Sequence, residues 1–170
     1  EKSSIQVIAN GLPASPGAAS GKVVFTSEEA ERLNDMMQDT ILVRVETSPE
    51  DIQGMHAAKG ILTARGGMTS HAAVVARGMG RPCVSGSSEI DINYEQKIFK
   101  TSSAEVKEGD IITIDGSTGR IILDKVPTVK PEISGDFSKL MRWADNVRKL
   151  KVRTNSETPL DTKTARDFGA

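Results

Sequence analysis

The chain of 170 residues contains few aromatic residues and a single cysteine. Aromatic residues make up 4% of the sequence, so we expect an aliphatic core of isoleucine, valine, leucine, alanine and methionine. The single cysteine, Cys83, excludes a disulfide within the chain and fits a reducing compartment. Because Cys83 follows a proline in an expected strand, we expect its thiol to be buried and unreactive.

Charge of one sign and long hydrophobic runs are also missing. The 22 basic and 23 acidic side chains leave a net charge of -1, and the basic ones are scattered. Nucleic-acid-binding proteins carry a basic stripe, so we predict no nucleic-acid partner. No apolar run approaches the ~18–20 residues of a membrane span, and no signal-peptide pattern is present. We therefore expect a cytoplasmic protein without a membrane partner. Since the chain starts at Glu1 without methionine, we expect it to be a fragment.

Hydrophobic periodicity predicts strands and helices that first alternate and are then followed by strands alone. Gly11–Gly17 holds two prolines and two glycines, so we expect a loop there. This order favours a mixed α/β fold, a compact β barrel or sandwich flanked by helices, over a doubly wound sheet. The expected strands are 4–8, 21–26, 40–45, 60–63, 82–85, 90–93, 97–100, 111–115 and 119–123, and the expected helices are 27–38, 49–58 and 69–77.

The character of the chain changes near Val126. Residues 127–131 read as an extended, proline-containing linker. The apolar spacing over 135–150 predicts an amphipathic linker helix. Lys151–Asn155 then reads as a strand, and a last helix begins near Thr158. We therefore predict four parts: an N-terminal linker and opening loop (1–17), the main domain (18–125), a linker and helix (126–150), and the start of a further domain (151–170).

The stretch Gly66–Arg77 is the most informative part of the sequence. It places His71 at the start of the expected helix, directly after the paired glycines and two hydroxyl residues. Glycine backbone and the first turn of a helix both present N–H groups, and the helix dipole adds positive potential. Such a place binds phosphate, and an imidazole beside it is a nucleophile that can carry a phosphoryl group. The residues therefore indicate a phosphohistidine site at His71.

The neighbours of His71 have expected roles in this chemistry. A hydroxyl of Thr69 or Ser70, or a nearby carbonyl, would hold one ring nitrogen so that the other points outward; the residues do not decide which. Helix N–H groups and Arg65 would offset the charge of the phosphoryl group. The expected phosphate-stabilising residues are Arg65, Gly66, Gly67, Thr69 and Ser70. The alternative is that His71 is an ordinary structural histidine.

A metal site is not expected in this chain. It contains two histidines, His56 and His71, and the sequence places no carboxylate cluster beside either. We interpret His56 as an ordinary helix residue.

Several stretches resemble the phosphohistidine, or swivelling, domain of the enzymes that use phosphoenolpyruvate. Ala14–Gly21 (Ala-Ser-Pro-Gly-Ala-Ala-Ser-Gly) is similar to the loop that opens this domain. Leu62–Gly78 is similar to the pyruvate phosphate dikinase branch, because Met68 stands where the phosphoenolpyruvate synthases and the sugar-transport phosphotransferases usually carry arginine. Cys83–Gly86, Asp115–Gly119 and Leu150–Asn155 are also similar to the dikinases.

The resemblance implies a β/β/α phosphoryl-carrier domain whose catalytic residue, His71, forms tele-phosphohistidine. An N-terminal nucleotide-grasp domain would load it with the β-phosphoryl of ATP, with phosphate as co-substrate. A C-terminal (β/α)₈ barrel would pass the group to pyruvate, giving phosphoenolpyruvate. The carrier would swing on joints at Asn10–Gly17 and Val126–Gly135.

The resemblance also implies properties of the whole enzyme. These are Mg²⁺ without ligands in this chain, a homodimer, and regulatory phosphorylation of Thr69. A plastid or glycosome is the alternative to the cytoplasm, and the fragment alone would be inactive. Two other functions stay open at this point: the carrier domain of a phosphoenolpyruvate synthase, and a non-catalytic docking module.

Overall fold

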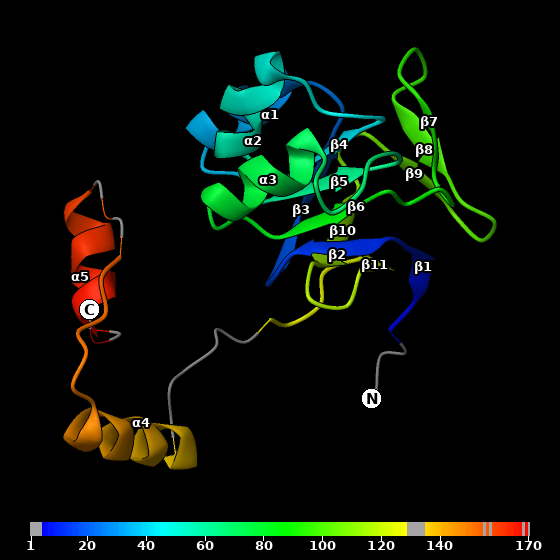
Figure 1. The fold of residues 1–170 in the computed structure, drawn as a ribbon. Helices are drawn as coiled ribbons and strands as arrows, with labels where there is room; N and C mark the ends of the chain where they lie inside the picture. The colour runs from blue at the N-terminus through cyan, green and yellow to red at the C-terminus, as the bar shows by residue number, and fades with distance from the viewer. Residues whose placement is uncertain (1–4, 129–134, 155, 157, 168, 170) are drawn as a thin grey trace. The chain divides into compact units, whose positions relative to one another are not determined.

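The computed structural model describes residues 5–128, 135–154, 156, 158–167 and 169. The chain divides into two compact units, Glu1–Thr128 and Val129–Ala170. The first unit contains the strands β1 to β11 and the helices α1 to α3 (Figure 1). The second contains α4 (Gly135–Val147) and α5 (Pro159–Asp167). No helix among the described residues has the length and apolarity that a bilayer crossing requires.

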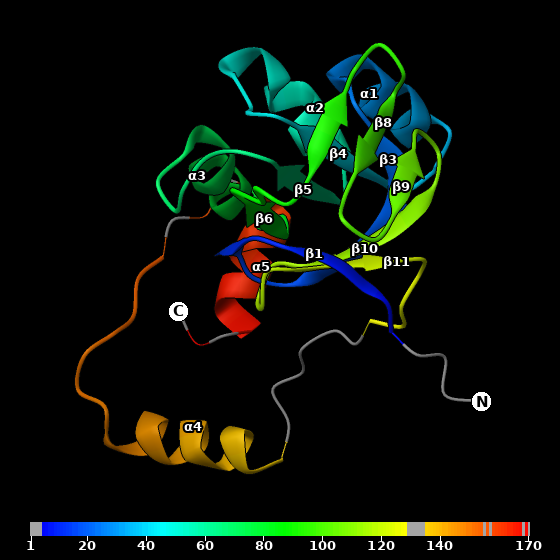
Figure 2. The same ribbon diagram turned by 90° about the vertical axis from the view of Figure 1, so that its right-hand side faces the viewer.

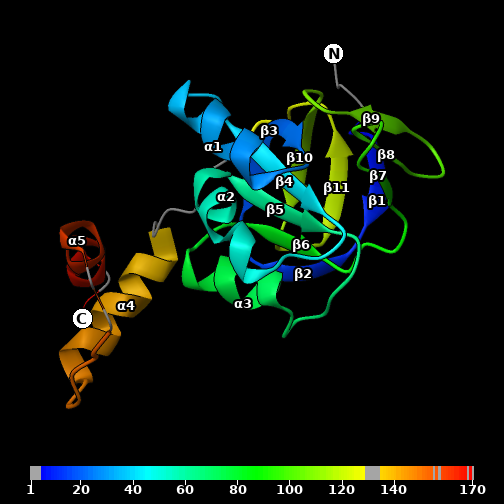
Figure 3. The same cartoon turned by 90° about the horizontal axis from the view of Figure 1, so that it is seen from above.

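An eight-stranded mixed sheet forms the body of the first unit, in the order β1-β11-β10-β3-β4-β5-β6-β2. Strands β3 to β6 pair in parallel, and the other neighbours are antiparallel. The edge strands β1 and β2 are separated in the chain by Gly11 alone, so the sheet must curl back on itself (Figure 3). The strands are β1 (Val7–Asn10), β2 (Leu12–Ser15), β3 (Ala18–Val24), β4 (Thr40–Arg44), β5 (Gly60–Thr63), β6 (Cys83–Ser85), β10 (Ile111–Asp115) and β11 (Arg120–Leu123).

A small antiparallel sheet packs beside the large one (Figure 2). It consists of β7 (Asp91–Asn93), β8 (Ile98–Lys100) and β9 (Glu105–Lys107). Its fully buried Phe99 and Val106 belong to the same apolar cluster as Val23 and Ile112 of the large sheet. The small sheet therefore closes the core on the side away from the helices.

The helices cover one face of the large sheet (Figures 1 and 3). They are α1 (Ser27–Asp35), the 3₁₀ turn η1 (Pro49–Asp51), α2 (Ile52–Ala57) and α3 (His71–Gly78). A hydroxyl residue caps the N-terminal end of three of these elements, α1, η1 and α3. Thr26 precedes α1 and Ser70 precedes α3, where the side-chain oxygen accepts a backbone N–H, and Ser48 precedes η1.

Strand residues alternate between two apolar clusters, because successive side chains point to opposite faces of a sheet. In β4, Ile41 and Val43 enter the cluster shared with the small sheet, whereas Leu42 packs under the helices. In β5, Leu62 and Ile61 divide in the same way. The central strands are thus buried on both faces and make a firm platform for the loops at their ends.

The mixed α/β fold with flanking helices, expected from the sequence, is confirmed, and β5 and β10 have the expected bounds. The loop expected at Gly11–Gly17 is wrong, because Leu12–Ser15 is an edge strand paired with β6. An edge position tolerates Pro13, whose missing N–H is not needed on an unpaired side. The prediction of an N-terminal linker over 1–17, with a joint at Asn10–Gly17, is therefore also wrong for residues 7–15.

Two further differences lie outside the large sheet. The strand β9 was not expected, because three residues with one apolar side chain give no clear period. The strand expected at Lys151–Asn155 is wrong, since 151–154 are irregular and Asn155 lies outside the described residues. The second expected joint, Val126–Gly135, falls partly on 129–134, also outside the described residues, and stays a prediction.

The buried thiol gives a first testable prediction. Burial raises the pKa of Cys83 from an ordinary 9.0 to about 12, which corresponds to about a thousandfold less thiolate at neutral pH. We expect an aromatic disulfide reagent to label Cys83 very slowly in the folded chain and rapidly in denaturant. Rapid labelling without denaturant would contradict the buried position.

Candidate functional site

The candidate site forms where the loops after β4 and β5 leave the sheet. These strands are parallel neighbours, with Arg44 beside Thr63, so their carboxyl ends meet at the same edge. Thr47 lies in the segment after β4, and His71 begins the helix after β5. Their side chains meet, with Thr47 Oγ1 3.0 Å from His71 Nδ1.

This contact divides the roles of the two ring nitrogens. The tautomer decides the direction of this bond: when Nδ1 carries the proton, the hydroxyl accepts it and the Nε2 lone pair is available, and when Nε2 carries the proton, the hydroxyl donates to Nδ1. The imidazole is half-buried and lines a pocket of about 190 Å³. The ring is thus held at Nδ1 and partly accessible, and its Nδ1–H tautomer is able to form a covalent bond through Nε2.

The glycine turn before His71 needs glycine for both conformation and space. Gly66 has φ +107°, a region that disfavours other residues, and a Cβ there would lie 2.9 Å from that of Ser70. Gly86 also has positive φ, and its Cβ would lie 2.3 Å from the Gly66 carbonyl oxygen. The two loops therefore approach each other backbone to backbone beside the site.

Buried hydroxyls fix the start of α3 to the ends of the strands. Ser70 Oγ accepts the Ala73 N–H at 3.3 Å and lies 3.3 Å from Ser85 Oγ. Thr63 Oγ1 donates to that same Ser85 oxygen at 3.2 Å. Since Thr63 and Ser85 end neighbouring strands and are buried, the helix start cannot shift easily relative to the sheet.

Arg77 ties the turn to the helix from the other side. Its guanidinium donates to the Met68 carbonyl and, at 3.1 Å, to that of Ala73. Arg77 lies in the last turn of α3, so these two bonds connect the loop before His71 to the helix that begins at His71.

The electrostatics of the pocket suit an anion but not a resident metal. Helix geometry leaves the N–H groups of His71 and Ala72 without intrahelical acceptors, and Arg65 adds a cation at the rim. The lining includes one carboxylate, that of Glu46. Across the described ranges, no three His, Cys, Asp or Glu side chains gather to hold a metal. Since Mg²⁺ takes several oxygen ligands, the residues present do not fit a magnesium ion.

The structure brings together some of the residues predicted from the sequence. Arg65, Gly66 and Ser70 line the pocket with His71, whereas Gly67 and Thr69 are not among its lining residues. The hydroxyl on the ring comes from Thr47, and not from Thr69 or Ser70 as expected. The sequence did contain a signal for Thr47. Thr47 follows β4, and His71 follows β5, the next strand along the chain. Consecutive strands often pair, which brings the loops after them together.

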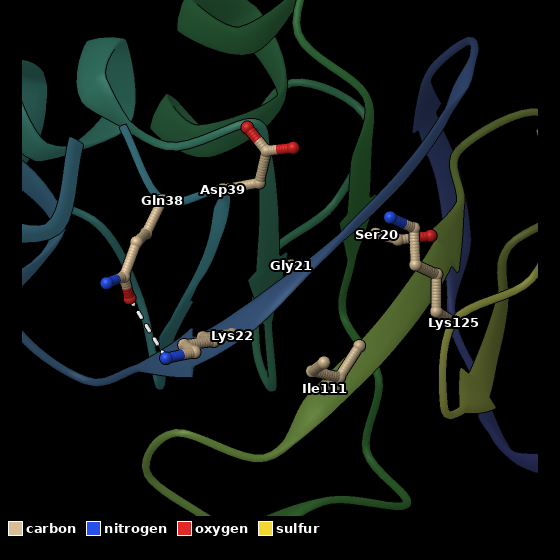
Figure 4. Close-up of a pocket in the computed structure, with 7 residues that line it drawn as sticks. All are labelled: Ser20, Gly21, Lys22, Gln38, Asp39, Ile111 and Lys125. Carbon is tan, nitrogen blue, oxygen red and sulfur yellow. Dashed lines mark hydrogen bonds between the residues drawn. The ribbon is translucent and has the colours of Figure 1, made fainter. Parts of the chain in front are cut away.

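A second pocket of about 230 Å³ lies between β3, β10 and the turn after α1 (Figure 4). The Lys22 amino group donates to Gln38 Oε1 at 2.9 Å, and Asp39 lines the same space. The Lys22 amino group is thus already hydrogen-bonded. None of the residues that the sequence predicted to be functional lines this pocket. We assign no role to this pocket.

Comparison with known proteins defines the class of this domain. Residues 36–119, which carry β4, β5, the glycine turn and His71, match the family described as PEP-utilising enzyme, mobile domain. This part of the chain belongs to that family, as the sequence resemblance implied.

Over almost its whole length the chain is similar to pyruvate, phosphate dikinases. It is 58% identical over 164 residues to that of Rhizobium meliloti (strain 1021), and 58% identical over 165 residues to that of Clostridium symbiosum. It is also 58% identical to pyruvate, phosphate dikinase 2 of Zea mays. These matches cover 96–97% of this chain and 18–19% of the relatives. The chain therefore spans about a fifth of the length of the curated relatives it matches.

The ring contact yields a second prediction. Thr47→Val removes the hydroxyl and keeps the shape of the side chain, so His71 loses the partner of Nδ1. We expect the reaction of Nε2 with a phosphoryl donor to slow about tenfold, the factor for one hydrogen bond to a group that gains charge. Phosphorylation of the chain by phosphoramidate, followed by ³¹P NMR, measures this rate. An unchanged rate would show that the hydroxyl does not orient the ring.

Proposed function

We propose that this chain is the phosphoryl-carrier domain of a pyruvate, phosphate dikinase. The observation that carries the proposal is the His71 imidazole, held through Nδ1 by Thr47 at the N-terminal end of α3 and open to a pocket. The identity of 58% to dikinases favours this enzyme over a phosphoenolpyruvate synthase or a docking module. The net reaction is ATP + pyruvate + phosphate = AMP + phosphoenolpyruvate + diphosphate.

The proposed chemistry uses the ring as a relay. The Nε2 lone pair forms a bond to the β-phosphorus of ATP, and AMP leaves with the electrons of the broken P–O bond. Nε2 then carries the β- and γ-phosphoryl groups together. An oxygen of inorganic phosphate attacks the γ-phosphorus, the bridging P–O bond between the β- and γ-phosphorus breaks, and diphosphate leaves with the β-phosphoryl still on His71. The P–N bond of phospho-His71 then breaks as the enolate oxygen of pyruvate attacks, and the lone pair returns to Nε2. Throughout, Nδ1 keeps its proton toward Thr47, while Arg65 and the helix N–H groups stabilise the charge.

The remaining parts of the enzyme are proposed from its relatives. A nucleotide-grasp domain would precede residues 18–125, and a (β/α)₈ barrel would begin at 151–170 after the linker and helix of 126–150. Mg²⁺ would be held by those other domains. The full enzyme would be a homodimer in the cytoplasm, or in a plastid or glycosome. Its carrier would swing on a joint within Val126–Gly135, on the microsecond to millisecond scale of domain motions.

The decisive test replaces one histidine at a time. The chain is exchanged for the matching segment of the Rhizobium meliloti dikinase, to which it is 58% identical, and the chimera is given ATP labelled in the β-phosphoryl. We expect acid-labile, base-stable label that His71→Ala abolishes, because His71 is the proposed carrier. His56→Ala, which changes the exposed histidine of α2, should keep the label.

Two results would refute the proposal. Label that persists after His71→Ala would place the carrier elsewhere. In the full-length protein that contains this chain, formation of phosphoenolpyruvate from ATP and pyruvate without any need for phosphate would indicate a synthase, because the dikinase consumes phosphate and the synthase releases it.

Regulation at Thr69 is proposed on the same footing. Its side chain is exposed two residues before His71, so a phosphate there would repel the incoming phosphoryl group. We expect Thr69→Asp to slow loading of His71 at least about fivefold at low salt, the effect of a like charge nearby. Thr69→Asn is the neutral control and should load at the wild-type rate. Equal rates for the two variants would argue against charge-based control.

A further inference from the structure

The segment that carries Thr47 is held at both ends by residues that do not line the pocket. At its start, the Val45 N–H donates to the Tyr94 hydroxyl at 2.7 Å. At its end, the Ser48 N–H donates to Asp51 Oδ2 at 2.9 Å. Neither Tyr94 nor Asp51 lines the pocket of His71. The two bonds therefore fix the backbone on either side of the residue that touches the ring.

Tyr94 is itself fixed by two neighbours in the first unit. It is the single tyrosine of the chain and follows β7 of the small sheet. Its ring meets Phe25 edge-on, with centroids 6.3 Å apart and planes at 88°. The Arg44 guanidinium carbon lies 5.4 Å from the centre of the same ring. The hydroxyl that reaches Val45 is thus set by the packing of the small sheet against β3 and β4.

Asp51 is buried, with 5% of its surface exposed, and its carboxylate has partners beyond the Ser48 N–H that it caps. Besides the Ser48 N–H, its carboxylate accepts the Ser27 hydroxyl at 2.9 Å. Arg44 Nε lies 3.4 Å from the same carboxylate. Arg44 also contacts Tyr94, so one guanidinium joins the two anchors of the segment.

We propose that Tyr94 and Asp51 are positioning residues of His71, because together they hold the Val45–Ser48 segment so that Thr47 orients the ring. The kinetic part of this inference rests on the proposed carrier function, whereas the effect on the ring itself does not. A bond lost at either anchor lets Thr47 Oγ1 move away from Nδ1, and the imidazole then exchanges between tautomers. A small displacement matters because transfer depends on the alignment of the attacking nitrogen.

Tyr94→Phe is the sharpest test, since it removes the hydroxyl and keeps the ring against Phe25 and Arg44. Tyr94 is 41% exposed, so the variant should fold. The matched control is Thr101→Val in the turn between β8 and β9. It removes a hydroxyl that accepts the Ala104 N–H at 3.0 Å within the same small sheet. Two readouts are taken on the 170-residue chain: the ¹⁵N shifts of the His71 ring, and the rate of phosphorylation by phosphoramidate.

We expect Tyr94→Phe to shift the two ring nitrogens toward a mixture of tautomers and to slow phosphorylation about fivefold, the factor for one neutral hydrogen bond. Asp51→Asn, which retains one acceptor oxygen but loses the charge, should move both readouts in the same direction. Thr101→Val should move neither. Folding of each variant is checked by the backbone amide spectrum.

The outcomes separate the two proposals. Wild-type ring shifts and rates in Tyr94→Phe, or equal changes in Thr101→Val, would overturn the positioning role and leave the carrier function intact. A wild-type chain in which His71 takes no phosphoryl group would refute the carrier function. In that case the ring shifts alone still decide whether Tyr94 sets the tautomer.

Discussion

The contact between Thr47 Oγ1 and His71 Nδ1 is the interaction on which the proposed chemistry of this domain depends. A histidine at the start of a helix is exposed to solvent and rotates freely unless something holds one of its nitrogens. Here a hydroxyl from the neighbouring loop holds Nδ1, and the other nitrogen takes the phosphoryl group in the proposed reaction. The glycine turn, the Ser70 cap and the Arg77 hydrogen bonds then keep the helix start in one place relative to that hydroxyl.

The platform beneath the contact explains why it can be accurate. Strands β4 and β5 are buried on both faces, so the points where their loops leave the sheet do not move relative to each other. The loop after β4 carries the hydroxyl and the loop after β5 carries the imidazole. The small sheet takes part through Tyr94, which reaches the first of these loops. The proposed carrier function needs such internal rigidity, because the domain would have to present the same nitrogen to two different sites.

Much of the fold was accessible from local pattern. The strands at Gly60–Thr63 and Ile111–Asp115 had the expected bounds, because strong apolar runs between turn residues leave little choice. Gly11–Gly17 failed because prolines and glycines were read as breakers, whereas an edge strand accepts them. The site residues likewise separate into those that local sequence predicted and one that it did not. His71, Arg65, Gly66 and Ser70 were found because they are neighbours in the chain, and Thr47 was missed because it is 24 residues away.

Sequence by itself determined the candidate nucleophile, its place at the start of a helix, and the family, because these depend on residue type and spacing over a short stretch. It also determined the layers of the fold through the periods of its strands and helices. Only the tertiary structure decided which hydroxyl holds the ring and which residues hold that hydroxyl. Those contacts join loops from different strands, and sheet order and register bring such loops together. No local pattern encodes that order.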